Sequence, residues 1–132
     1  MADRKIPFIG SVDTNPETKP FFDGAAQEKL VIPQCVETKK YIWYPRAISP
    51  FTLGPVEWRE VSGRGTVYTY CIAYDTLVRG FTPPYVVAQV ELPEQTGLRI
   101  VTNVIDCDPE SVAIGMAVAV TFQQVSDDVW LP

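Results

Sequence analysis

Short runs of β-branched and aromatic residues, separated by Gly, Pro and Asp, fill the second half of this chain. Such runs are typical of strands, whose side chains alternate between the two faces of a sheet. They predict strands at Val56–Val61, Thr66–Tyr74, Tyr85–Leu92, Leu98–Ile105 and Ala117–Gln124. Gly-containing turns follow the first strand, at residues 62–65, and the third, at residues 93–97. The pattern predicts a five-stranded barrel, with a small β-sandwich of the same strand count as the structural alternative.

The first half of the chain combines a helical segment with shorter extended ones. A helix is predicted from Pro16 to about Gln27. Thr14 or Asn15 can cap its first amides, and Pro suits the first helical position. Its apolar face comprises Phe21, Phe22, Ala25 and Ala26. Periodicity alone does not decide whether this face packs on the barrel or on a partner protein.

Two extended stretches, residues 29–34 and 39–44, flank a turn and predict a hairpin. The spacing around this hairpin is that of two C-x-x-C zinc knuckles in which only one of the four thiols is present. The four positions are Cys35, Thr38, Ser49 and Thr52. Because hydroxyl groups do not replace thiolates in a closed tetrahedral zinc site, no metal is expected here.

Without a metal, the hairpin must be stabilised by packing, since an isolated pair of strands is marginal in water. Aromatic side chains bury a large area and are expected to supply this packing. They are Tyr41, Trp43, Tyr44 and Phe51. If aromatic side chains of this region were exposed instead, they would point to a partner protein.

With 132 residues the chain fits one compact unit. The expected arrangement is a loosely ordered arm over residues 1–15, the helix and ribbon over residues 16–54, and the barrel over residues 55–132. No apolar run approaches the roughly 20 residues that cross a bilayer, and the start lacks the apolar stretch of a signal peptide, so a cytoplasmic protein is expected. The three cysteines are isolated and are interpreted as reduced thiols, with Cys71 buried.

The chain contains no histidine. This removes Ser-His-Asp and Cys-His catalysis and the usual imidazole metal ligands. No set of carboxylates, lysines or tyrosines forms a recognisable catalytic constellation, so a protein that is not an enzyme and has no cofactor is expected. The net charge of −5 disfavours binding to nucleic acid or anionic membranes, which depends on a basic surface.

Several short segments, taken in their order and spacing, carry a resemblance to a known family. They are residues 16–22, Gln34-Cys35, Tyr44-Pro45-Arg46, residues 63–70, residues 84–92 and residues 114–118. In these segments the chain resembles the OB-fold proteins associated with acyl-CoA enzymes, long described as a domain of unknown function. The resemblance implies an N-terminal helix, a rubredoxin-like zinc ribbon and a C-terminal OB barrel. The chain departs from this family at the ribbon, so a degenerate ribbon is expected.

The resemblance also directs attention to residues that could contact CoA or a partner. Four arginines are candidates to meet CoA phosphates: Arg46, Arg64, Arg79 and Arg99. The connection over residues 75–84 is longer than a hairpin needs, and both it and the C-terminal segment carry apolar residues outside any clear core strand. The candidate partner interface is Leu77, Phe81, Tyr85 and Trp130. Each of these segments packs on the barrel or contacts a partner.

Three hypotheses follow. The first, implied by the resemblance, is a non-catalytic accessory subunit that binds a thiolase-like or other acyl-CoA enzyme, stabilises it and helps to shape its acyl-CoA site. The second is a stand-alone OB module that binds acyl-CoA itself. The third is a single-stranded nucleic-acid binding OB domain, for which Tyr68, Tyr70 and Tyr74 are predicted to alternate on one strand face, as base stacking would require. The acidic balance weighs against the third hypothesis.

Overall fold

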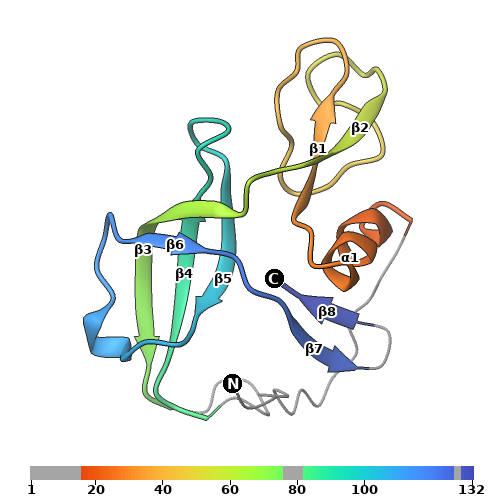
Figure 1. Ribbon diagram of the computed structural model, residues 1–132. Coiled ribbons are helices and arrows are strands. Elements are labelled where there is room, and N and C mark those ends of the chain that lie inside the picture. The colour runs from red at the N-terminus through yellow and green to blue at the C-terminus, as the bar shows by residue number, and fades with distance from the viewer. Residues whose placement is uncertain (1–15, 76–81, 127–128) are drawn as a thin grey trace.

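The computed structural model describes residues 16–75, 82–126 and 129–132, with the backbone alone at residues 125–126 and 129–131. The elements in chain order are α1 (Lys19–Ala26), β1 (Val31–Cys35), β2 (Val56–Glu60), β3 (Arg64–Ala73), β4 (Tyr85–Glu91), β5 (Arg99–Val104), the 3-10 turn η1 (Pro109–Ser111), β6 (Ala117–Ala119), β7 (Gln123–Ser126) and β8 (Val129–Leu131). Figure 1 shows a ribbon, formed by β1 and β2 and their loop, beside a curled antiparallel sheet of β3 to β6. The expectation of a mainly β protein with an OB-type barrel and an N-terminal helix is confirmed.

The core lies on the inner face of the curled sheet. Alternate residues of β4 are buried, as expected for a strand with one face toward the interior. Their neighbours across the sheet are Val67 of β3 and Ile100 of β5, which are also buried. Leu30 and Ile32, beside and within β1, belong to the same buried cluster. The ribbon and the sheet therefore share one core.

The helix is shorter than its sequence pattern predicts. It begins at Lys19, with Thr18 at the N-cap, whereas residues 16–18 form a turn. Gly24 lies in the middle of the helix, where Gly is normally destabilising. A Cβ at this position would lie 2.7 Å from Val31 Cγ2, so the residue allows β1 to approach the helix closely. The predicted caps, Thr14 and Asn15, lie outside the described residues.

The prediction that residues 56–61 form the first barrel strand is wrong. This segment, β2, pairs antiparallel with β1, from Val31↔Glu60 to Cys35↔Val56. The predicted hairpin partner, residues 39–44, contributes only an isolated bridge between Gln34 and Tyr41. After this bridge Trp43 packs on Phe21 of the helix, with ring centroids 5.1 Å apart, and β2 pairs along β1.

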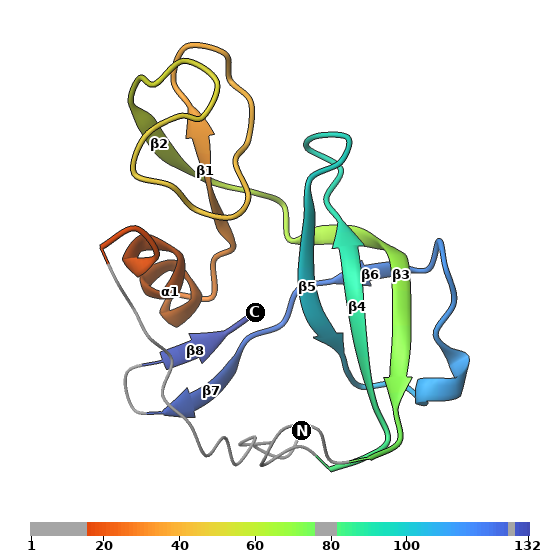
Figure 2. The ribbon, with the colours of Figure 1, turned by 180° about the vertical axis from the view of Figure 1, so that it is seen from behind.

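The predicted fifth strand, residues 117–124, is divided into two short strands. β6 pairs with the start of β3, whereas β7 pairs with β8. Among the described residues the sheet order is β5-β4-β3-β6, so β5 and β6 are edge strands and β7 does not pair with β5. Figures 1 and 2 both place β5 on the side of the sheet that faces α1 and the β7–β8 hairpin. The barrel is therefore a half-barrel that is open on this side.

The turn between β4 and β5 joins the sheet to the ribbon. Its presence at residues 93–97 is as predicted, and Gly97 supplies the positive φ of 82°. The side chain of Gln95 accepts a hydrogen bond from Tyr41 N at 2.8 Å and donates one to Tyr41 O at 3.3 Å. Glu94 accepts a hydrogen bond from Ser62 N at 2.8 Å, on the link between β2 and β3. These contacts set the position of the ribbon relative to the half-barrel.

Across the described ranges, no helix has the length and apolar character needed to span a bilayer.

Candidate functional site

The ribbon contains two similar tight turns, at residues 35–38 and 49–52. In the first turn Thr38 N donates a hydrogen bond to Cys35 Sγ at 3.5 Å. In the second, Ser49 Oγ accepts hydrogen bonds from Phe51 N at 3.1 Å and Thr52 N at 3.4 Å. Cys35 and Ser49 are both fully buried. The structure therefore brings together the four positions that the sequence pattern singled out.

The two turns also contact each other through their side chains. Cys35 Sγ lies 3.6 Å from Thr52 Oγ1, which accepts a hydrogen bond from Gly54 N at 3.1 Å. The donor set is one thiol and three hydroxyls, which does not fit a structural zinc site because hydroxyl groups are poor zinc ligands. Within the described residues, no group of three or more His, Cys, Asp or Glu could hold a metal ion. The contact between Cys35 and Thr52 connects the two turns.

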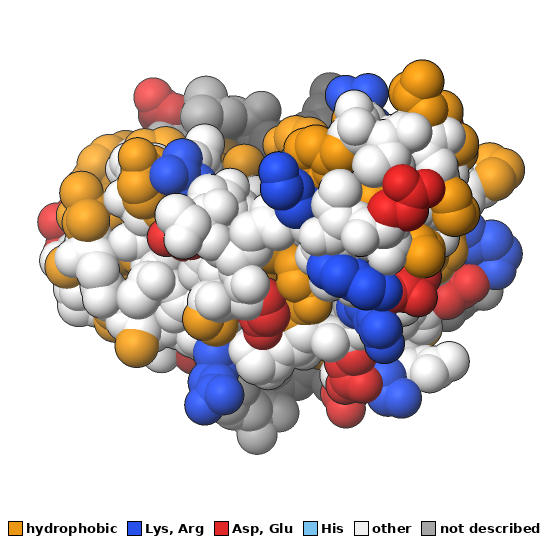
Figure 3. Space-filling model, turned by 90° about the horizontal axis from the view of Figure 1, so that it is seen from above, with side chains coloured by type: hydrophobic (Ala, Val, Ile, Leu, Met, Phe, Trp, Pro, Cys, Tyr) orange, Lys and Arg blue, Asp and Glu red, His pale blue; other side chains and the backbone are white. Residues whose placement is uncertain are grey.

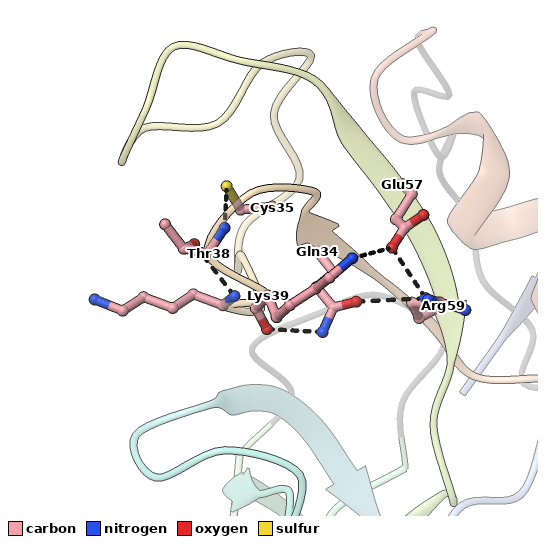
Figure 4. Close-up of polar contacts among 7 residues, drawn as sticks. Gln34, Cys35, Thr38, Lys39, Glu57 and Arg59 are labelled. Atoms are coloured by element: carbon pink, nitrogen blue, oxygen red, sulfur yellow. Dashed lines mark hydrogen bonds and ion pairs between the residues drawn. The ribbon is translucent and has the colours of Figure 1, made fainter.

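Hydrogen bonds from these hydroxyls change the acidity of the thiol. Those from Ser49 and Thr38 lower the pKa of Cys35 to about 6, from its ordinary value of 9.0, and outweigh the opposing effect of burial. Figure 4 shows Cys35 beside the turn of Thr38, at one end of the polar contacts between β1 and β2. At the other end, Gln34 donates to Lys39 O at 2.7 Å and Arg59 lies 3.2 Å from Glu57. The exposed ion pair between Arg59 and Glu57 contributes little stability.

The ribbon loop, residues 44–53, exposes several large apolar side chains. The exposed fractions are 66% for Tyr44, 54% for Ile48, 50% for Phe51 and 76% for Leu53. Lys40 lies over the Phe51 ring, 5.0 Å from its centroid. Figure 3, seen from above the ribbon, shows hydrophobic side chains standing among charged ones on the ribbon side. The loop therefore presents a mixed apolar and charged surface.

The sequence-based prediction for the aromatic residues of the ribbon is half correct. Tyr41 and Trp43 pack against the core cluster, as expected of residues that stabilise the ribbon. Tyr44 and Phe51 were assigned the same role, but they are exposed. Ile48 and Leu53 were not singled out at all. Ile48 lies directly before the second turn and Leu53 directly after it.

The described candidate cations for CoA phosphates lie on different elements. Arg99, on β5, is 3.3 Å from Glu91 and stacks on Tyr68, 3.6 Å from the ring centroid. Arg64 is exposed at the start of β3, and Arg46 is exposed in the ribbon loop. Arg79 lies outside the described residues. Arg99 is held by its neighbours, so its planar face and one N–H are already engaged.

Most of the predicted partner interface lies outside the described part of the structure. Leu77 and Phe81 lie outside the described residues, as does the side chain of Trp130. Tyr85 is half-buried at the start of β4, opposite Ala73 of β3.

The three tyrosines required for nucleic-acid stacking do not share a face. A β-bulge between Val67 and Thr69 shifts the register of β3 by one residue. Tyr70 consequently lies opposite the buried Ala88 and packs against the core, whereas Tyr68 is exposed under Arg99. The same shift leaves Cys71 exposed, contrary to the prediction that it is buried. The sequence alternation did not reveal the bulge.

A partly open cavity of about 700 Å³ lies on the open side of the half-barrel. Its walls include β5 and the segment after it, the β6 region, and α1 with Trp43 of the ribbon. The sequence analysis did not predict it, because the expected fifth strand would have closed the barrel. Trp43 Nε1 is buried without a hydrogen-bond partner in the described structure.

Comparison with known proteins agrees with this architecture. Residues 58–123, half of the chain, match the family model of the ChsH2 C-terminal OB-fold domain. A solved structure of an Ltp2-ChsH2(DUF35) aldolase is 32% identical and aligns with a TM-score of 0.83, covering 92% of this chain and 95% of that one.

Two curated relatives differ in length from this chain. A probable enoyl-CoA hydratase alpha subunit of Thermomonospora curvata is 36% identical over 85% of this chain, which spans only 35% of that subunit. A DUF35 domain-containing scaffold protein of Methanocaldococcus jannaschii is 38% identical over 66% of this chain and 63% of its own length. From the family match, the shared fold and these identities, the chain belongs to the ChsH2 C-terminal OB-fold family, the DUF35 proteins, whose OB domains are associated with acyl-CoA enzymes.

Proposed function

We propose that this protein is a non-catalytic accessory subunit of a thiolase-superfamily or related acyl-CoA enzyme, which it stabilises and whose acyl-CoA site it helps to shape. Relatives of the chain are named as a hydratase alpha subunit and a scaffold protein, and a similar chain was solved as part of an Ltp2-ChsH2(DUF35) aldolase. The absence of histidine removes the usual general base for independent catalysis.

The ribbon loop is the observation that carries this proposal. Four large apolar side chains on one short loop of a small domain expose area that a protein–protein contact would bury. Aromatic residues such as Tyr44 and Phe51 are enriched in the energetically important parts of interfaces. The second hydrogen-bonded turn, residues 49–52, lies within the loop and holds its backbone, so less conformational entropy has to be lost on binding.

Leu53 adds a second argument for the same surface. Its backbone has a φ of 59°, in the left-handed region that Gly or Asn occupies at lower cost. Its side chain is also the most exposed of the four apolar side chains of the loop. Within this chain, an exposed leucine in a strained conformation gains nothing, and we infer that it contributes to a contact with another protein.

A second candidate function, a stand-alone module that binds CoA through arginines, receives less support. Arg99 is paired with Glu91, and the described arginines lie on separate elements. The nucleic-acid alternative required a shared face for three tyrosines, which the bulge in β3 removes.

The test is affinity purification of the tagged chain from its host, comparing the unaltered protein with a Phe51→Ser, Leu53→Asn variant. We expect an acyl-CoA enzyme subunit to co-purify in fixed ratio with the unaltered chain and to be lost with the variant. Asn suits the positive φ at position 53, so the variant should remain folded.

The matched control is Ile114→Ser, which removes an apolar side chain that is 71% exposed but lies on the sheet side, before β6. This variant should retain the enzyme. Equal recovery of the enzyme by all three proteins would show that the ribbon loop is not the contact, and recovery of no acyl-CoA enzyme by any of them would contradict the accessory role.

A further inference from the structure

The cavity on the open side of the half-barrel has the size and lining of a small-molecule site. Ligand pockets commonly measure about 300–1,000 Å³ and are mostly apolar, and this cavity measures about 700 Å³. Two continuous runs, residues 100–107 and 116–121, form much of its wall. The first run contains the edge strand β5 and the second contains β6. The cavity therefore occupies the place that a closing strand would fill.

The chemistry of the lining favours a hydrocarbon group. Among the described lining residues the only charged one is Asp106, which is exposed. The polar side chains of two others already have partners, since Thr102 Oγ1 donates to Pro132 O at 3.1 Å and Asn103 Nδ2 donates to Val86 O at 2.9 Å. Phe21, Leu92 and Ile100 are among the apolar residues of the wall. A neutral, apolar occupant loses no hydrogen bond by entering this site, whereas an ionic one would be desolvated without a partner.

We propose that this cavity binds the hydrocarbon part of an acyl group, either as a CoA thioester or as the free acid. The side chains of the ribbon loop do not line the cavity, so the site is separate from the proposed partner surface. The choice of acyl ligands rests on the proposed function, because the family is associated with acyl-CoA enzymes. The cavity itself is tested on the isolated chain.

The cysteines of the chain provide an internal reporter. Cys107 lines the cavity, whereas Cys71 is exposed and absent from the described lining, and Cys35 is fully buried in the ribbon. A bound acyl group should therefore shield Cys107 from a maleimide and leave the labelling rate of Cys71 unchanged. Peptide mass spectrometry measures the two rates in the same sample.

The experiment compares hexanoyl-, decanoyl- and hexadecanoyl-CoA with CoA alone and with hexadecanoic acid. Each methylene that is buried should lower the Kd roughly fourfold until the cavity is full. Equal protection by the thioester and the free acid would show that the cavity recognises the hydrocarbon alone, and stronger protection by the thioester would add a contact to CoA. Either result supports the site, and protection by CoA alone would contradict it.

A cavity-narrowing variant gives a second measurement. Val104 packs against the core and lines the cavity, so Val104→Phe should weaken protection of Cys107 about tenfold or more. The matched control is Val87→Phe, because Val87 is the β4 neighbour of Asn103 and does not line the cavity. If Val104→Phe does not fold, the chain-length series on the unaltered protein still tests whether the cavity binds the acyl group.

The proposal is overturned if Cys107 labels at the same rate with every acyl ligand, or if only a partner protein protects it. Loss of the partner with the ribbon-loop variant and loss of acyl protection with Val104→Phe are separate results. The failure of one proposal is therefore distinguishable from the failure of the other.

Discussion

The curled sheet and the ribbon hold their structures in different ways. The inner face of the sheet is apolar and buries residues such as Val67 and Val86 almost completely. The ribbon instead buries Cys35 and Ser49 with their polar atoms hydrogen-bonded, and it exposes Phe51 and Leu53. A unit this small has too little apolar surface for a core of its own. Its shape therefore depends on local hydrogen bonds together with the packing of Tyr41 and Trp43 on the shared core, and the apolar side chains of its loop remain exposed.

The largest expected effect converts the ribbon to the metal-stabilised form. The variant Thr38→Cys, Ser49→Cys, Thr52→Cys would place four thiols at the ends of the two turns. We expect it to bind one zinc ion per chain, since zinc binding to four such ligands contributes on the order of 10 kcal/mol in zinc-finger peptides. Metal analysis and a melting temperature that falls on chelation measure this. The variant without Thr52→Cys is the control, and failure of the four-thiol chain to retain zinc would show that the turns are not arranged as knuckles.

Truncation of one leucine in each region sharpens the comparison directly. Leu92→Ala removes a side chain from the buried cluster and should lower the free energy of unfolding by about 2–5 kcal/mol. Leu53→Ala removes an exposed side chain and should change it by less than about 0.5 kcal/mol. Urea unfolding measures both. Similar losses for the two variants would mean that the ribbon loop packs on the domain after all.

The hydrogen bonds of the ribbon should have an effect of intermediate size. Ser49→Ala leaves Phe51 N and Thr52 N without their acceptor in a buried position, at a cost of about 1–3 kcal/mol. Ser62→Ala, where the exposed hydroxyl accepts from Arg64 N, is the control and should be nearly neutral. If Ser49→Ala also changed the free energy of unfolding very little, the stability of the ribbon would have to come from the packing of its aromatic residues.

A further expected effect is a pH dependence that originates in the ribbon. The pKa of Cys35 is lowered to about 6 in the folded chain, from an ordinary value of 9.0. Between these two values the unfolded chain binds more protons than the folded one, so stability should rise with pH. The contribution is fully present above the ordinary value and is lost as the pH falls through the folded pKa. Urea midpoints over this range should rise less for Cys35→Ser, and ultraviolet absorbance of the thiolate gives the pKa directly.

A large part of the sheet could be predicted from local pattern. The strands β3, β4 and β5 lie within one or two residues of the runs that predicted them, and the turn at residues 93–97 is where its Gly and Pro place it. These features depend on neighbours in sequence and on strand propensity. The pairing partners of the edge segments were harder to predict. For example, β2 was expected to start the barrel, but it pairs with β1 in the ribbon.

The candidate site was predictable only where residues of a recognisable chemical type occur at a recognisable spacing in the sequence. The four knuckle positions were recognised by their spacing, and the structure brings them into contact. The surface of the ribbon loop and the cavity were not recognised. Whether a residue is buried depends on which distant segments of the chain pack against it, and the local sequence does not give these. Tyr70 and Tyr68 illustrate this, since one bulged residue places them on different faces.

The sequence by itself determined the strand-forming runs, the lack of histidine, and the one thiol and three hydroxyls at the four spaced positions of the ribbon. These properties follow from residue types and short spacings. Only the tertiary structure decided that β2 joins β1, that the half-barrel stays open beside β5, and that Leu53 faces solvent. The reason is physical, because strand pairing and burial arise from contacts between distant segments, and no short stretch of the chain specifies both partners.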